Sequence, residues 1–197
     1  MSSWRQFDPD AVPASPLPLS TASRVRILGL DPGSRRTGFG IIDCEANGHA
    51  HIAHGCIAGQ GEAIAPRLRM IFEGVERLIG AYQPDEIAIE RVFVNRNVDS
   101  AMKLGQARGA ALCAVPVGTP VFEYAPRAIK LAVVGSGAAE KSQVAHMMKV
   151  LLQLAALPGP DAGDALAIAV CHANTRRLQV LISTQSVHCA GRPGGAG

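Results

Sequence analysis

The sequence predicts an α/β fold with a five-stranded mixed sheet and helices on both faces. Two observations carry this prediction. Three strand-like segments, at about 25–31, 36–43 and 49–58, follow one another as in an antiparallel meander. An amphipathic helix at 63–82, with apolar residues spaced three and four apart, then leads to a short apolar strand at 85–90. Such a crossover allows the new strand to lie parallel to the first.

The second half of the sequence adds one strand and four helices. The strand is expected at 121–124, and the helices at 98–115, 126–134, 138–154 and 161–175. Proline and glycine residues separate these segments, as is usual between elements. No internal repeat is visible.

The length and composition indicate one folded domain with two tails. The chain has 197 residues, of which 48% are apolar and 18% charged, as in globular proteins. Residues 1–23 lack periodic apolar positions and are expected to be disordered, and 178–197 are expected to form a weakly ordered tail. The domain therefore spans 24–177. No signal peptide or membrane-spanning run is apparent, so we expect a cytoplasmic protein without membrane contact.

The cysteines and clustered histidines do not indicate a metal or disulfide framework. Five cysteines, an odd number, occur without a CxxC pair. His49, His51 and His54 alternate with apolar residues in a predicted strand and lack cysteine or carboxylate companions. We interpret them as structural histidines.

The positive charge is concentrated in the middle of the chain. The net charge is only +3, but residues 91–149 contain eight basic and three acidic side chains. Such a surplus suits contact with a phosphate backbone. A solvated surface would give the same pattern.

Four acids lie at the ends of predicted elements. Asp31 follows the first strand, Glu90 ends the fourth, and Asp161 and Asp164 lie in the first turn of the last helix. Asp31 alone could cap a turn, and helix-start acids could simply complement the helix dipole. Adjacent parallel strands, however, would bring Asp31 and Glu90 together, and the helix could add its acids there. Two Mg²⁺ ions suit such a cluster and promote phosphodiester hydrolysis.

The sequence resembles the RuvC family of Holliday-junction endonucleases in five segments, in order between Val25 and Asn174. They are LGLDPGSRRTGFGIID, AIERVFVNRN, SAMKLGQARGAAL, VVGSGAAEKSQV and PDAGDALAIAVCH. The resemblance implies a ribonuclease H-like fold and a Mg²⁺-dependent homodimer that nicks four-way junctions symmetrically in DNA recombination and repair. A branch-migration motor of the RuvA and RuvB type is the implied partner. The resemblance also makes Asp31, Glu90 and Asp161 central metal ligands, with Asp164 as the fourth acid.

Four further residues are expected to contact DNA. The resemblance places Phe93 against unstacked bases near the junction centre and Lys130 and Lys141 along the DNA path. Arg96, in the polar stretch after Phe93, could hold the adjacent phosphate. Phe93 could instead belong to the core, beside two valines, and Lys141 could face bulk water.

Three other functions fit the sequence less well, and one helix face could form an interface. An actin-like or sugar-kinase-like phosphotransferase needs a second phosphate loop and two lobes, for which the chain has no room. An RNA-acting relative of the same fold is disfavoured by the ERVF and LGQARG segments. A non-catalytic DNA-binding subunit would have lost an acid. Gly105 and Gly109, four apart on one helix face, fit either internal packing or a dimer interface near 104–112.

Overall fold

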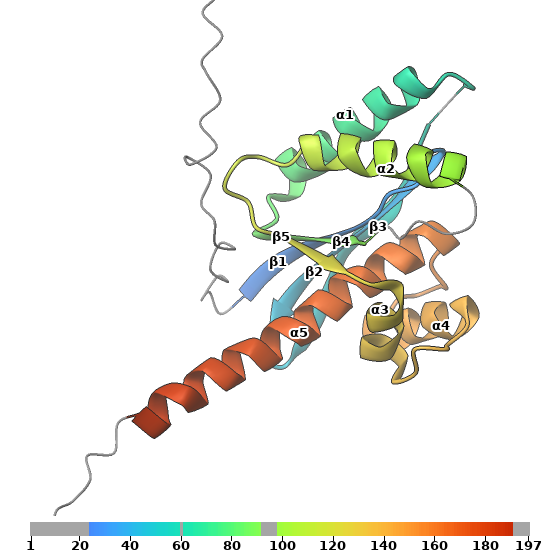
Figure 1. The fold of residues 1–197 in the computed structure, drawn as a ribbon. Helices are drawn as coiled ribbons and strands as arrows, with labels where there is room; N and C mark the ends of the chain where they lie inside the picture. Colours follow the sequence, from blue (N-terminus) through green and yellow to red (C-terminus); the bar gives the residue numbers. More distant parts are fainter. Residues whose placement is uncertain (1–23, 60, 92–97, 191–197) are drawn as a thin grey trace, which may run out of the picture.

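A five-stranded mixed sheet forms the centre of the molecule (Figure 1). The computed structural model describes residues 24–59, 61–91 and 98–190, with side chains described as far as residue 179. The strand order is β3-β2-β1-β4-β5. The strands are β1 (Arg24–Asp31), β2 (Arg36–Glu45), β3 (Gly48–Ala58), β4 (Glu86–Glu90) and β5 (Val121–Tyr124). The prediction of a five-stranded α/β fold is confirmed.

The strand directions place the ends of β1 and β4 side by side. β1, β2 and β3 form an antiparallel meander, whereas β4 is parallel to both β1 and β5. In the β1–β4 pair, Leu30 is opposite Ile89. The next residue of each strand is Asp31 or Glu90, so both acids emerge at the same edge of the sheet, as the crossover predicted.

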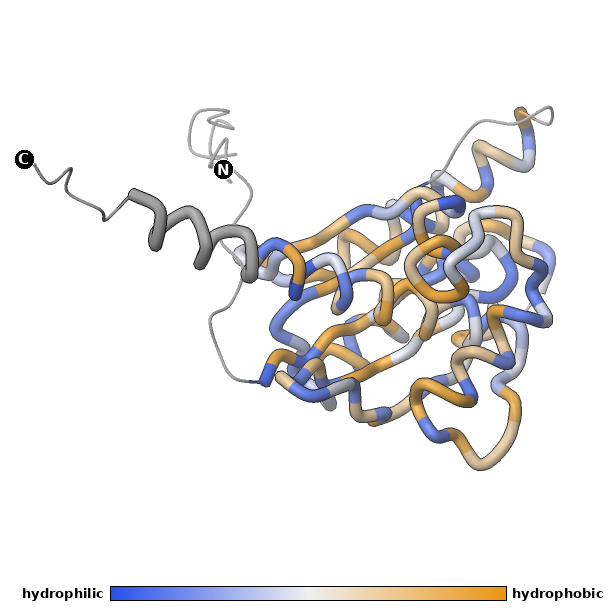
Figure 2. The backbone as a smooth tube through the Cα atoms, turned by 90° about the horizontal axis from the view of Figure 1, so that it is seen from below, coloured by the Kyte–Doolittle hydropathy of each residue, from blue (hydrophilic) through white to orange (hydrophobic). Residues whose placement is uncertain are grey.

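Helices cover both faces of the sheet (Figure 1). One layer contains α1 (Ile64–Tyr82) and α2 (Val98–Cys113). The other contains α3 (Pro126–Val134), α4 (Lys141–Leu151) and α5 (Pro160–Ala190). Apolar backbone segments run through the middle of the molecule between these layers (Figure 2).

Alternation along β1 assigns its side chains to the two layers. Leu28 and Leu30 are fully buried against the α1–α2 layer, whereas Val25 and Ile27 are fully buried on the α5 side. Burying each of these side chains contributes about 1.5–3 kcal/mol. Successive residues of a strand face opposite sides of the sheet. Asp31 therefore points to the same side as Val25 and Ile27, toward the α5 layer.

Glycines in β2 allow α5 to lie directly on the sheet. A Cβ atom at Gly38 would overlap the backbone of Asp161, and one at Gly40 would come within 2.8 Å of Leu166. The start of α5 is therefore held close to the start of β2. This contact determines where the acids of the α5 first turn can lie.

Two helices differ from the prediction by three residues or more. The helix expected from residue 138 begins at Lys141, because Glu140 and Gln143 form a reciprocal capping box. The last helix, expected to end near Thr175, continues to Ala190 as α5. No proline or glycine interrupts that stretch. The expected disorder of 1–23 lies outside the described residues and stays a prediction.

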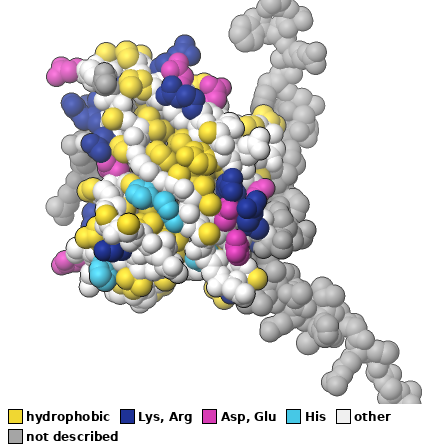
Figure 3. Space-filling model, turned by 180° about the vertical axis from the view of Figure 1, so that it is seen from behind, with side chains coloured by type: hydrophobic (Ala, Val, Ile, Leu, Met, Phe, Trp, Pro, Cys, Tyr) yellow, Lys and Arg dark blue, Asp and Glu magenta, His cyan; other side chains and the backbone are white. Residues whose placement is uncertain are grey.

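The surface is polar and mixed in charge. From behind, basic and acidic side chains lie next to one another around an apolar area (Figure 3). Exposed helical pairs such as Lys103–Asp99, at 2.6 Å, stabilise the fold by only about 0–1 kcal/mol. Among the helices described, none combines the length and apolar character needed to cross a membrane.

Candidate active site

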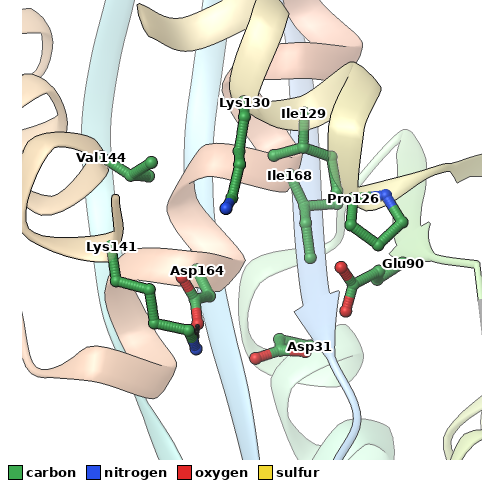
Figure 4. Close-up of a pocket in the computed structure, with 9 residues that line it drawn as sticks. All are labelled: Asp31, Glu90, Pro126, Ile129, Lys130, Lys141, Val144, Asp164 and Ile168. Carbon is green, nitrogen blue, oxygen red and sulfur yellow. Dashed lines mark hydrogen bonds and ion pairs between the residues drawn. The ribbon is translucent and has the colours of Figure 1, made fainter. Parts of the chain in front are cut away.

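A pocket of about 280 Å³ opens at the carboxyl ends of β1 and β4 (Figure 4). Three acids, Asp31, Glu90 and Asp164, line it together with two lysines, Lys130 and Lys141. The remaining lining residues are Pro126, Ile129, Val144 and Ile168. The pocket is thus lined by three acidic, two basic and four apolar side chains.

Each charged residue of the pocket comes from a different element. Asp31 ends β1 and Glu90 ends β4, while Asp164 lies near the start of α5. Lys130 projects from α3 and Lys141 is the first residue of α4. The site exists only because the sheet and the α3–α5 layer pack together.

Burial and mutual repulsion raise the pKa values of the two strand-end acids. Burial, followed by the charges of Glu90 and Asp164, raises the pKa of Asp31 to about 7. The pKa of Glu90 is also raised, first by burial and then by Asp164. A hydrogen bond with Asp31 and the nearby Lys130 offset part of this rise. The acids therefore favour binding of a positive charge at this point.

The two lysines differ in their contacts. The Nζ atom of Lys141 donates a hydrogen bond to Asp164 Oδ2 at 2.7 Å, and this bond raises the pKa of Lys141. Its side chain is nevertheless 77% exposed. Lys130 reaches down from α3 toward the acids (Figure 4). Both lysines line the pocket, and their contact with DNA stays a prediction.

Asp161 does not line this pocket. Its Oδ2 atom accepts a hydrogen bond from Arg36 Nε at 2.6 Å and lies 3.7 Å from Cys56 Sγ. Residues three apart on a helix are separated by about 60° around the axis. Asp164 therefore points to the strand ends while Asp161 points to the start of β2. Phe93 and Arg96 lie outside the described residues.

Two arginines near the acids were missed by the sequence analysis. Arg36 is the partner of Asp161 described above. Arg108 of α2 donates to the backbone carbonyl of Glu90 at 3.3 Å and pairs with Glu123 of β5 at 2.6 Å. It therefore links the end of β4 to its neighbours. Both contacts join residues far apart in the chain, which no local pattern reveals.

A buried polar network surrounds Glu86, which lies at the opposite end of β4 from Glu90. Tyr124 and His172 share a hydrogen bond of 2.7 Å at the Nδ1 atom, and His172 Nε2 lies 2.8 Å from Glu86 Oε2. Arg176 Nε lies 3.2 Å from both Glu86 oxygens. Phe122 stacks on the imidazole at 4.3 Å. The side chains of His172 and Glu86 are 1% and 0% exposed, so this network is part of the core.

The clustered histidines have protein partners. His49 pairs with Asn174 at 3.1 Å, and His51 and His54 contact each other at 2.7 Å. This agrees with their interpretation as structural residues. Over the part of the chain that the structure describes, no three His, Cys, Asp or Glu side chains are grouped closely enough to hold a metal ion.

The sheet order and the acidic edge define the class of protein. A mixed five-stranded sheet with the central strands ending in carboxylates, covered by helices on both faces, is a ribonuclease H-like fold. The family model described as crossover junction endodeoxyribonuclease RuvC matches residues 27–172. The chain therefore belongs to the RuvC family.

Individual relatives agree over most of the chain. RuvC from Shewanella sp. (strain W3-18-1) is 52% identical over 158 residues, which are 80% of this chain and 91% of the relative. RuvC from Shewanella sp. (strain MR-4) is 53% identical with the same coverage. The structure of Thermus thermophilus RuvC in complex with Holliday junction substrate has a TM-score of 0.73 and 32% identity, and covers 79% of this chain and 96% of that one.

Proposed function

We propose that this protein resolves Holliday junctions by cutting two opposed strands symmetrically, in homologous recombination and DNA repair. The family membership supports a crossover junction endodeoxyribonuclease. The observation that carries the proposal is the convergence of Asp31, Glu90 and Asp164 from β1, β4 and α5 on one open pocket. Such a pocket can admit a phosphodiester together with its counter-ions.

The acids have the donor chemistry for two Mg²⁺ ions, although no three of the described acids are grouped as metal ligands in this structure, so ion binding would have to draw them together. All candidate ligands are carboxylates, which are the oxygen donors that Mg²⁺ prefers. Burial and like charges raise the pKa values of Asp31 and Glu90, so a bound cation would relieve their repulsion. We assign Asp31, Glu90, Asp161 and Asp164 as the ligands. When bound, such ions activate the attacking water and stabilise charge on the scissile phosphate.

The basic residues would position the DNA strand over these acids. Lys130 and Lys141 both line the pocket, and either ammonium can attract a backbone phosphate. Arg108 would keep Glu90 in place, because it holds the backbone carbonyl of that residue. Orientation of the phosphate by fixed groups accounts for part of the rate of such reactions.

Phe93 is assigned to stacking on a base exposed when the junction opens, with Arg96 on the adjacent phosphate. Stacking of this kind is worth about 1 to 3 kcal/mol per base. On this account, Phe93→Ala impairs cleavage with little change in melting temperature, and a junction with unpaired central bases restores part of the rate. A large fall in melting temperature with normal cleavage would place Phe93 in the core instead.

Two symmetric cuts call for two sites related by a two-fold axis, so the protein is proposed to act as a homodimer. We place the dimer interface on α2, near residues 104–112. Its Val98 and Met102 are 63% and 62% exposed, and Gly105 and Gly109 have open space where a Cβ atom would lie. We also propose that the protein works with a branch-migration motor of the RuvA and RuvB type. Its proposed location is the cytoplasm.

Purified protein incubated with a synthetic four-way junction tests the function. With Mg²⁺ we expect paired nicks in the junction and none in a linear duplex of the same sequences, and with EDTA we expect binding without cleavage. Equal cutting of both substrates would indicate a general nuclease. Binding without cutting in Mg²⁺ would indicate a passive junction binder, and either result would overturn the proposal.

A further inference from the structure

One acid of the candidate site is paired with a residue that the proposed chemistry does not use. Arg36, the first residue of β2, donates from Nε to Asp161 Oδ2 at 2.6 Å. This acid is one of the four assigned to the metals, yet it is absent from the lining of the pocket. The pair lies beside the pocket, since the charge of Asp161 still contributes to the raised pKa of Asp31.

The backbones of the pair are fixed but the side chains are not. Gly38, two residues after Arg36, packs directly on the backbone of Asp161, so the two elements cannot separate there. The Arg36 side chain is 61% exposed and that of Asp161 is 32% exposed. Exposed ion pairs are weak, because water competes for both partners. The side chains can therefore exchange partners without any movement of β2 or α5.

The second acid of the α5 start is paired in a similar way. Lys141 contacts Asp164 at 2.7 Å, so each α5 acid carries a basic side chain from another element. Asp31 and Glu90 contact each other instead. An arginine remains charged at every accessible pH. Loss of the arginine's proton therefore does not open the Arg36–Asp161 pair, whereas a competing charge on either partner can.

We propose that Arg36 is a positioning residue that couples metal binding to DNA binding through Asp161. In the absence of DNA its guanidinium holds the Asp161 carboxylate away from Asp31 and Glu90. A backbone phosphate that takes the guanidinium releases Asp161 to the metal site, because guanidinium binds phosphate through two parallel hydrogen bonds. This inference rests on the proposed function.

This coupling predicts that Arg36→Gln changes the affinities for Mg²⁺ and for junction DNA in opposite directions. Without DNA, the variant binds Mg²⁺ more tightly, by about two- to fivefold, because Asp161 is no longer held by a competing cation. In EDTA, the same variant binds a four-way junction more weakly, and the slope of log affinity against log salt is shallower by about one. Isothermal titration measures the first effect and a salt series of binding assays measures the second.

Arg35 provides a matched control. It is the neighbouring residue, it carries the same charge and its side chain is exposed. Arg35→Gln changes the net charge by the same amount but leaves the Arg36–Asp161 contact in place, so we expect the Mg²⁺ affinity to stay unchanged. Arg36→Lys, which retains the charge but not the planar fork, should keep most of the salt slope. Melting temperatures within about a degree or two of the parent protein exclude loss of the fold.

The outcomes separate this inference from the proposed function. If Arg36→Gln and Arg35→Gln give the same Mg²⁺ affinity, or if Arg36→Gln binds Mg²⁺ more weakly, the coupling role is wrong. That result leaves the metal site intact as long as Asp31→Asn and Glu90→Gln remain inactive. If those two variants cut junctions normally, the proposed site itself fails, whatever Arg36→Gln does.

Discussion

The two ends of β4 hold glutamates on the same face in opposite environments. Glu86, the first residue, is fully buried and lies within 2.8 Å of His172 and 3.2 Å of Arg176. Glu90, the last residue, has Asp31 and Asp164 as its neighbours, and burial, followed by the charge of Asp164, raises its pKa. Glu86 thus has basic side chains as its direct partners, whereas Glu90 lies beside two other acids in a pocket that also contains two lysines.

The same helix faces both ends. Asp164 and His172 lie eight residues apart on α5, which corresponds to about 12 Å along the helix axis. The contacts at the Glu86 end fix the register of α5 on the sheet, whereas the acids at the Glu90 end repel one another. We infer that the buried end stabilises an arrangement that the acidic end opposes. Like charges held together in this way are ready to bind cations.

The largest expected effect on stability comes from breaking the buried end. His172→Ala removes the partner shared by Tyr124 and Glu86 and leaves a cavity under Phe122. We expect the free energy of unfolding to fall by about 3 to 5 kcal/mol, as for other buried aromatic side chains. Urea unfolding followed by circular dichroism measures this change.

His146→Ala is the control for that measurement. His146 lies on α4 and its side chain is exposed. Its removal should change the free energy of unfolding by less than about 0.5 kcal/mol. Equal small effects of both substitutions would mean that the buried network does not hold α5 in place.

Without metal, the acids at the Glu90 end should make the free energy of unfolding depend on pH. The fold raises the pKa of Asp31 from 3.8 to about 7, mainly by burial. Between these values the folded state binds a proton that the unfolded state lacks, so the stability contributed by this group falls as pH rises through the window. Asp31→Asn should remove that fall, so the variant gains stability relative to the parent between pH 5 and pH 8.

Urea unfolding in EDTA at the two pH values makes this comparison. A constant difference between parent and Asp31→Asn at pH 5 and pH 8 would contradict the raised pKa. Addition of Mg²⁺ should stabilise the parent and not the variant, because ligand binding to the folded state alone shifts unfolding.

The smallest expected effect comes from Lys130, one of the two lysines that line the pocket. Lys130→Ala should weaken junction binding at low salt and make its salt dependence shallower by about one, since one phosphate contact is lost. Lys149→Ala, at the far end of α4, serves as the control and should leave the slope unchanged. A lost cleavage rate with an unchanged slope would assign Lys130 to the chemistry.

Much of the site followed from the positions of acids relative to periodic segments. The apolar run before Asp31 and the crossover to Glu90 were enough to place both at one sheet edge, because parallel neighbours end together. The charge surplus at 91–149 indicated only a basic region, the resemblance singled out Lys130 and Lys141 within it, and the structure places both at the pocket.

Contacts between distant segments were not predictable. Arg36 and Asp161 are 125 positions apart in the chain, and their contact depends on how closely α5 lies on β2. The sequence predicts that Asp161 and Asp164 both join the strand-end acids, but their side chains point about 60° apart around the helix and have different partners, Arg36 and Lys141. The network of Glu86 and His172 was missed because a single acid at a strand start and a single histidine on a helix carry no local pattern.

Cleavage by two glutamate variants tests the central claim most directly. Glu90→Gln and Glu86→Gln make the same chemical change at opposite ends of β4. The account predicts that Glu90→Gln loses cleavage by at least about a hundredfold while its melting temperature is maintained, because a metal ligand is lost. Glu86→Gln should have a lower melting temperature and still cut junctions below it. Normal cleavage by Glu90→Gln, or loss of cleavage by a folded Glu86→Gln, would contradict the account.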